Sequence, residues 1–201
     1  MTRVPIREGK LIYHLTHINN LESIIQCGML SRNDVQNRCS LFSDVADPNI
    51  IKKRGRELGA YIPFHFHPRT AFDYAVVYNH GRENLIYLCV TREYARANGF
   101  KVLPKHPLTT QIKDSTLMDY DNGITSIDWE KMECEYSDNT IVKQVRMAEC
   151  LTDKSIPFRD LRCIFYLTPD QKDKIESILR KRGISYPSPY INDGTKFHHH
   201  K

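Results

Sequence analysis

The segment NLIYLCVT, residues 84–91, constrains the fold of this chain more than any other feature. An uninterrupted apolar run bounded by polar, turn-forming residues is typical of a strand buried in the middle of a sheet. The segments AECL (148–151) and RCIFYL (162–167) have the same character, and further strands are expected over 11–13 and 61–68. The core of the protein is therefore predicted to be a β-sheet.

Helices are expected around this sheet. Thr16 is predicted to cap a helix that carries an apolar stripe and ends at Gly28. REYARANG (92–99) predicts a short helix, and a well-signalled last helix is expected to begin after Pro169 and to end at Gly183. Because these elements do not alternate as regular βαβ units, the predicted fold class is α+β with a mixed or antiparallel sheet.

The irregular part of the chain is expected over residues 101–147. Within it, YDNG (120–123) predicts a turn and IDWEKMECEYS (127–137) has helical character. Residues from about 31 to 59 are polar and are predicted to form a mobile loop or short helix that covers substrate. No repeat or linker divides the chain, so residues 1–201 are interpreted as a single domain, with 196–201 as a tail that is either native or an added tag.

The composition limits the location and chemistry of the protein. No segment approaches the roughly 18–20 apolar residues of a membrane span, and the N-terminus lacks the apolar region of a secretory signal. A cytoplasmic protein without a membrane partner is therefore expected. The six cysteines contain no C-x-x-C pair and lie mostly in apolar segments, which favours small buried residues. The net charge of +5 is compatible with nucleic-acid binding without establishing it.

Four features could carry chemistry, and each has a purely structural alternative. His65 and His67 lie two apart on an expected strand, but a metal site needs a third ligand that the sequence does not supply. The basic run KKRGR (52–56) suits phosphate contacts or a solvated turn. His14 and Thr16 in YHLTH, with His17 after them, precede an expected helix start, where backbone donors suit anions. Their alternative is a helix cap with a surface histidine.

Glu149 is the fourth feature and the most unusual one. It lies in the otherwise apolar segment RMAECLTD. A carboxylate in a buried strand costs free energy unless it is paired or has a function. A buried salt bridge to an arginine and a catalytic role are both consistent with this position.

Five segments, in this order, resemble the DarT family, the bacterial DNA ADP-ribosyltransferase toxins of DarT–DarG systems. They are IYHLTHINNLESIIQCGML, IKKR, YIPFHFHPRTAFDY, IDWEKM and AECL. The resemblance implies an ADP-ribosyltransferase-like split mixed β-sheet with a central NAD cleft and peripheral helices. It also implies that ADP-ribose passes from NAD, the co-substrate, to a base of single-stranded DNA, with release of nicotinamide and without a metal. The implied partners are single-stranded DNA and a macrodomain-type or other ADP-ribosyl hydrolase antitoxin, and the implied state is a monomer.

The resemblance assigns roles to residues at matching positions. The implied catalytic residues are Glu149 and Arg54. The implied NAD contacts are His14, Thr16, Tyr13, Asn20, Gly28 and Arg54. The implied nucleic-acid contacts are Arg69, Arg56, Lys53, Thr70 and Phe72. The chemistry is consistent with these roles, because a carboxylate can stabilise the positive charge that develops on the ribose and accept a proton from the attacking base.

The chain also departs from the family pattern. The family often has Arg-Ser-Pro-Met after the aromatic strand, whereas this chain has Arg69-Thr70-Ala71-Phe72. The target base therefore stays open, with thymine slightly favoured over guanine. Gly55 stands where another arginine is common, so that a one-residue shift would give the key position to Lys53. The alternative functions are transfer to RNA or protein, a non-catalytic nucleic-acid-binding module, and a metal hydrolase that uses the histidine pair.

Overall fold

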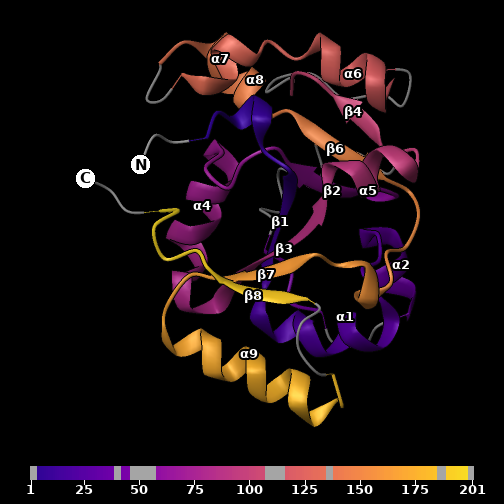
Figure 1. Ribbon diagram of the computed structural model, residues 1–201, viewed down its shortest axis with the longest axis vertical. Coiled ribbons are helices and arrows are strands. Elements are labelled where there is room, and N and C mark those ends of the chain that lie inside the picture. Colours follow the sequence, from indigo (N-terminus) through magenta and orange to yellow (C-terminus); the bar gives the residue numbers. More distant parts are fainter. Residues whose placement is uncertain are drawn as a thin grey trace.

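The computed structural model describes residues 4–38, 42–45, 58–106, 116–134, 138–184 and 189–198, and only the backbone of 36–38. The described residues form one eight-stranded sheet in the order β5-β4-β6-β2-β1-β3-β7-β8, with helices around it (Figure 1). All neighbouring strands are antiparallel except β7 and β8, which are parallel. The predicted α+β fold with a mixed sheet is confirmed. The strands are β1 Leu11–His17, β2 Ile62–His65, β3 Leu85–Thr91, β4 Lys101–Leu103, β5 Met118–Asp119, β6 Glu149–Thr152, β7 Cys163–Tyr166 and β8 Tyr190–Asp193.

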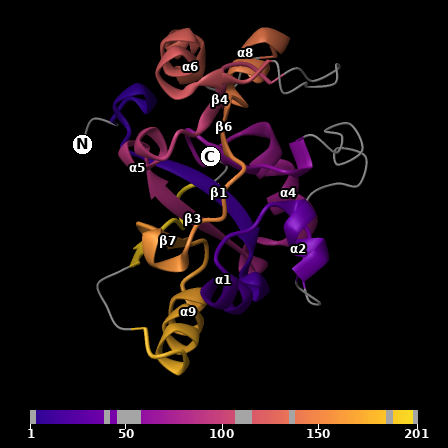
Figure 2. The same ribbon diagram turned by 90° about the vertical axis from the view of Figure 1, so that its right-hand side faces the viewer.

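The helices lie on both faces and at both ends of the sheet (Figures 1 and 2). They are α1 Leu21–Cys27, α2 Arg32–Arg38, α4 Ala71–His80, α5 Arg92–Ala97, α6 Tyr120–Ser126, α7 Trp129–Glu133, α8 Thr140–Arg146 and α9 Asp170–Lys181. A 3-10 turn, η2 Ile18–Asn20, joins β1 to α1. None of the helices that the structure describes is long and apolar enough to cross a membrane.

The alternation of side chains along the strands produces two apolar layers. The larger layer contains Ile12, Phe64 and Leu88 and packs against α1, α5, α9 and the α6–α8 group. The smaller layer contains Leu15 and Tyr87 and packs against α4 and the C-terminal segment. The helices α4 and α5 therefore lie on opposite faces of the sheet (Figure 2). The strand β3, predicted from its continuous apolar run, is buried in both layers.

The sheet divides between its two central strands. β1 pairs with β3 along its whole length, from Leu11 opposite Thr91 to His17 opposite Leu85. With β2, in contrast, β1 shares the single register pair of Tyr13 with His65. Next to this pair, Nδ1 of His14 lies 2.7 Å from the carbonyl oxygen of Pro63 in β2, so a side chain bridges the strands where backbone pairing stops. The sheet therefore consists of two half-sheets, β5-β4-β6-β2 and β1-β3-β7-β8. This arrangement agrees with the split mixed sheet that the family resemblance implies.

Two local predictions are wrong. Thr16 does not cap a helix, because β1 continues through it and α1 begins only after η2. YDNG is not a turn, because α6 runs through it from Tyr120 to Ser126. The glycine of this segment, Gly123, allows the helix to approach the sheet closely: a Cβ at Gly123 would lie 2.4 Å from the Cβ of Val102 in β4.

Other predictions are confirmed with shifted boundaries. α1 ends at Gly28, whose φ of 78° is of the left-handed kind that glycine adopts readily. The predicted strand over 61–68 is shorter, since β2 ends at His65. Part of the expected loop at 31–59 is the helix α2, and the rest lies largely outside the described residues. Cys89, Cys150 and Cys163 are free and buried, as expected, whereas Cys27 and Cys134 are exposed.

Candidate active site

Glu149, the first residue of β6, lies in the interior of the protein with a relative exposure of 1%. Its register partners are His65 in β2 and Leu103 in β4, and Tyr13 in β1 is in turn opposite His65. Residues that are directly opposite one another have their side chains on the same face. Glu149, His65 and Tyr13 therefore face the layer that α4 covers.

A second histidine lies beside the carboxylate of Glu149. Nε2 of His106, which follows β4, is 3.9 Å from Oε1 of Glu149. At this distance a protonated His106 forms an ion pair with the carboxylate. The sequence did not reveal this neighbour, because His106 lies in the irregular region whose strand pairing has no sequence signature. The pairing of β4 with β6, in which Leu103 is opposite Glu149, brings His106 close, and this pairing is visible only in the structure.

His14 and Thr16 lie at the division between the half-sheets. The ring of His14 packs 5.6 Å from that of Phe64, and its Nδ1 donates to the carbonyl of Pro63. Thr16 is buried, and its hydroxyl accepts a hydrogen bond from Nδ2 of Asn20 at 3.1 Å. By alternation along β1, these two side chains leave the strand on the face opposite to Tyr13.

Asn20 holds a surface segment against the end of β1. Its Nδ2 donates to the carbonyl of Ser43 at 2.9 Å, and its Oδ1 accepts from the amide of Ser43 at 2.8 Å. The bidentate ion pair of Arg32 with Asp44 fixes the same segment from α2. Asn20 therefore ties the segment around Ser43 to the end of β1.

Two of the residues implied as NAD contacts have clear structural roles. Tyr13 packs in the smaller layer, with ring centroids 6.1 Å from Tyr87, 6.0 Å from Phe165 and 6.2 Å from Phe197, and burial raises the pKa of its hydroxyl. Gly28 ends α1, and a Cβ there would lie 2.7 Å from the carbonyl oxygen of Ile156. Both positions are thus constrained by packing.

The residues implied as nucleic-acid contacts lie where β2 leads into α4. Thr70 is fully buried and forms a capping box with Asp73: its hydroxyl accepts from the amide of Asp73 at 3.1 Å, and Oδ2 of Asp73 accepts from the amide of Thr70 at 2.9 Å. Phe72, in the first turn of α4, has its ring 5.9 Å from that of His65. Arg69 is half-buried beside them. Phe72 thereby packs α4 against His65, the residue opposite Glu149 in the sheet.

His65 and His67 bind different backbone carbonyls and, among the described residues, do not form a joint metal site. Nδ1 of His65 donates to the carbonyl of Ala148 at 3.4 Å, whereas Nε2 of His67 donates to the carbonyl of Arg146 at 3.1 Å. Nδ1 of His67 accepts from the amide of Arg69 at 3.2 Å, which requires a neutral ring. Burial above all, with Arg146, His65 and Arg69 adding to it, lowers the pKa of His67 well below 6.5. Within the described part of the chain, no group of three or more His, Cys, Asp or Glu residues is arranged to hold a metal.

The basic residues of KKRGR fall outside the described residues. The roles that the resemblance implies for Arg54, Lys53 and Arg56 therefore stay predictions.

Comparisons with known proteins find the same family, DarT, over nearly the whole chain. A family model described as ssDNA thymidine ADP-ribosyltransferase, DarT, matches residues 13–197. A DNA ADP-ribosyl transferase of Thermus sp. (strain 2.9) is 23% identical over 185 residues, which are 85% of this chain and 87% of the relative. A DNA ADP-ribosyl transferase-DNA ADP-ribosyl glycohydrolase fusion protein of Thermosipho africanus (strain H17ap60334) is 21% identical over 194 residues, 92% of this chain and 49% of the fusion.

Solved structures share the fold. Thermus sp. 2.9 DarT in complex with ADP-ribosylated ssDNA superposes with a TM-score of 0.80 at 21% identity, covering 99% of this chain and 100% of that one. The same protein in complex with NAD+ gives a TM-score of 0.77 at 19% identity, with 96% and 98% covered. The sheet and the helices around it are thus a fold that this chain shares with solved DarT structures. Since the family model matches most of the chain, the protein belongs to the DarT family of single-stranded-DNA ADP-ribosyltransferases.

Proposed function

We propose that this chain transfers ADP-ribose from NAD to a base of single-stranded DNA, with Glu149 as the catalytic carboxylate. The observation that carries the proposal is the nearly complete burial of Glu149 on a core strand, in a chain matched over 13–197 by the DarT family model. Removing a carboxylate from water costs several kcal/mol even after the protein relaxes. A buried carboxylate is therefore retained where it is paired or where its charge has a function.

The chemistry needs a negative charge beside the reacting ribose. When the bond between C1′ of the ribose and the nicotinamide nitrogen breaks, nicotinamide leaves as a neutral molecule and positive charge develops on the sugar. The carboxylate of Glu149 stabilises this charge. A base nitrogen then forms the new bond to C1′ and loses its proton, which Glu149 accepts as a general base.

The NAD side of the reaction is proposed to lie along the division between the half-sheets. His14 and Thr16 stand at this division, and Asn20 ties the following surface segment to it. Arg54, or Lys53 in a shifted alignment, contacts the phosphates. The Thermus sp. 2.9 relative with the same fold has been solved in complex with NAD+, which supports NAD as the co-substrate.

The DNA side is proposed to lie at the start of α4. Arg69 contacts the phosphate backbone and Phe72 stacks on a base beside Glu149, as aromatic residues do in single-strand-binding proteins. Arg56 adds a further phosphate contact. Thr70 is left out of this proposed interface because its hydroxyl is committed to the helix cap. Thymine is the proposed target, in keeping with the description of the family model.

We also propose that the enzyme is a cytoplasmic, monomeric toxin with an ADP-ribosyl hydrolase as antitoxin. The fusion of the two activities in the Thermosipho africanus relative supports this partner, because the hydrolase removes the modification that the transferase adds.

The proposal is tested by incubating the purified protein with NAD and four acceptors: a single-stranded DNA pool, duplex DNA, RNA and protein. We expect a mass increase of one ADP-ribose on single-stranded DNA alone, and fragmentation that locates it on thymine. Modification of RNA or protein in its place would favour the alternative acceptors. Salt-sensitive DNA binding without NAD consumption would indicate a non-catalytic module.

A further inference from the structure

Arg146, the last residue of α8, joins two segments that are far apart in the sequence. Its Nη1 donates to the carbonyl oxygens of Met132 at 2.7 Å and of Cys134 at 2.8 Å, both at the end of α7. Its Nη2 donates to the carbonyl oxygen of Arg69 at 3.3 Å, in the turn between β2 and α4. One guanidinium thus connects the end of α7 to the turn that carries the proposed DNA contact.

His67 completes the attachment of Arg69 from the other side. Nδ1 of His67 accepts from the amide of Arg69 at 3.2 Å, and its Nε2 donates to the carbonyl of Arg146 at 3.1 Å. Both backbone polar groups of Arg69 are therefore held, one by His67 and one by Arg146. A backbone fixed on both sides restricts the directions in which the Arg69 side chain can point.

Arg146 also stands close in sequence to the proposed catalytic residue. Only Met147 and Ala148 separate it from Glu149, the first residue of β6, and the carbonyl of Ala148 accepts from His65. The short connection means that the turn at Arg69 and the strand of Glu149 share one anchor.

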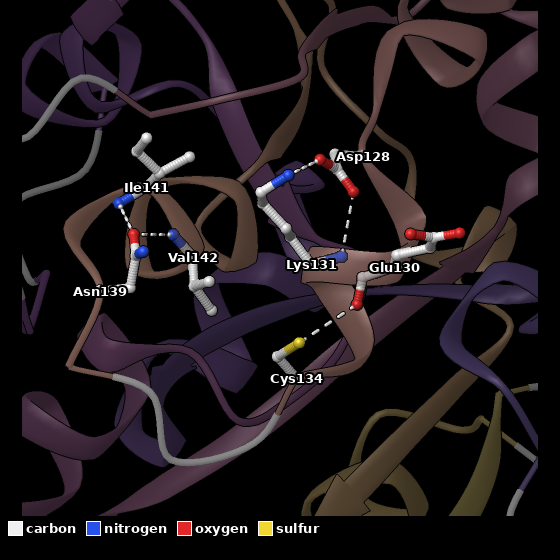
Figure 3. Close-up of polar contacts among 7 residues, drawn as sticks. All are labelled: Asp128, Glu130, Lys131, Cys134, Asn139, Ile141 and Val142. Carbon is white, nitrogen blue, oxygen red and sulfur yellow. Dashed lines mark hydrogen bonds and ion pairs between the residues drawn. The ribbon is translucent and has the colours of Figure 1, made fainter.

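The N-terminal caps of the two helices around Arg146 do not involve its guanidinium (Figure 3). Asp128 caps α7 by accepting from the amide of Lys131 at 3.0 Å, and Asn139 caps α8 by accepting from the amide of Ile141 at 2.8 Å. Cys134 also donates to the carbonyl of Glu130 at 3.4 Å. Loss of the Arg146 guanidinium is therefore expected to leave these caps in place and to release its three carbonyl partners, at the end of α7 and at Arg69.

We propose that Arg146 is a positioning residue for the DNA acceptor: it fixes Arg69 relative to Glu149 and touches neither substrate. The inference rests on the proposed function, because it assigns Arg69 to the DNA. A planar guanidinium offers five donors in a fixed fork and can span three carbonyls, whereas the compact ammonium of a lysine cannot reach them together. Arg146→Lys should therefore rescue only part of the effect of Arg146→Met.

The experiment compares Arg146→Met with wild type and with Arg180→Met as the matched control. Arg180 is exposed on α9, at the opposite end of the molecule from α7 and α8 (Figure 1). Initial rates are measured with varied single-stranded oligonucleotide at saturating NAD, and with varied NAD at saturating oligonucleotide. We expect kcat/KM for DNA to fall by roughly tenfold or more in Arg146→Met, as misplacement of a binding group does, with KM for NAD within about twofold of wild type. Arg180→Met should match wild type.

A double-mutant cycle separates positioning from a general structural role. If Arg146 acts through Arg69, the loss caused by Arg146→Met should shrink when Arg69 is already replaced in Arg69→Ala. Additive losses, or equal losses towards NAD and DNA, would overturn the inference. If thermal unfolding shows that Arg146→Met does not fold, the same cycle with Arg146→Lys decides by the same criteria. Absence of transfer by the wild-type protein would overturn the proposed function, and the inference with it, whereas an active wild type with an unaffected Arg146→Met would overturn the inference alone.

Discussion

Glu149 and His65 are directly opposite each other on the antiparallel strands β6 and β2, and Phe72 of α4 packs 5.9 Å from the ring of His65. The buried carboxylate is therefore two contacts away from the first turn of the helix that begins at the proposed DNA side. This relationship places Phe72, the proposed base-stacking residue, next to His65, whose strand partner is Glu149.

Phe72→Leu tests the DNA end of this arrangement, since leucine preserves apolar packing but has no aromatic face. We expect the affinity for single-stranded DNA to weaken by about 1–3 kcal/mol, the usual contribution of one stacked base, while NAD binding is unchanged. Fluorescence anisotropy of a labelled oligonucleotide measures the change. Tyr78→Leu is the control, because Tyr78 is 89% exposed on another turn of α4. Equal losses in the two variants would argue against a specific stack at Phe72.

His67 should make folding stability depend on pH. Burial first, and the neighbouring cations second, lower its pKa well below 6.5, so the unfolded chain binds a proton that the folded protein excludes. The contribution of neutral His67 is therefore present above pH 6.5 and is lost as the pH falls from 6.5 towards the pKa of the folded state. In His67→Gln, which offers an acceptor and a donor without titrating, the loss of unfolding free energy between about pH 7 and about pH 5 should be smaller than in wild type. Urea unfolding at a series of pH values measures it, and identical slopes would contradict this role.

Gly123 should be intolerant of any side chain. A Cβ at this position would lie 2.4 Å from the Cβ of Val102, so Gly123→Ala is expected to destabilise the protein by about 1–3 kcal/mol through overpacking. The same substitution in a Val102→Gly background should cost less, because the Cβ, Cγ1 and Cγ2 of Val102, which would lie 2.4, 2.9 and 3.2 Å from the new Cβ, are gone. Denaturant unfolding of the four proteins in this cycle measures the coupling. Equal costs in both backgrounds would show that Val102 does not set the requirement for glycine.

Patterns confined to one segment predicted the fold well. The apolar run of β3, the amphipathic pattern of α9 and the stop signals at Gly28 and Gly183 need no knowledge of distant residues. Glu149 could be singled out for the same reason, since a charge within an apolar strand is visible locally.

Features that depend on tertiary contacts could not be predicted. YDNG has the composition of a turn, but packing of Gly123 against Val102 keeps it helical. Threonine is a common helix-capping residue, yet pairing with Ile86 in β3 keeps Thr16 in a strand. The approach of His106 to Glu149 results from strand pairing alone.

The C-terminal segment should contribute to stability despite its tag-like sequence. Phe197 lies 5.0 Å from the ring of Phe165 and 5.8 Å from that of Tyr87, and Nε2 of His198 is 2.9 Å from the hydroxyl of Tyr87. Deletion of residues 197–201 is expected to lower the unfolding free energy by about 1–3 kcal/mol, less than truncating a fully buried phenylalanine, because Phe197 is half-buried. Deletion of 199–201 serves as the control and should leave Phe197 and His198 in place. Equal thermal midpoints for the two truncated proteins would show that the packed pair contributes nothing.

The central claim is that the carboxylate of Glu149 carries the transfer reaction, and its most direct test is mass spectrometry of a single-stranded oligonucleotide pool treated with NAD and either wild type or Glu149→Gln. Glutamine preserves the shape of the side chain and removes a buried charge, so the variant should fold at least as stably as wild type. We expect wild type to add one ADP-ribose to the DNA and the variant to be slower by roughly 10²–10⁴-fold, the range for loss of a general base. Transfer by Glu149→Gln within about tenfold of the wild-type rate would contradict the account, since that is well below the loss expected for such a group.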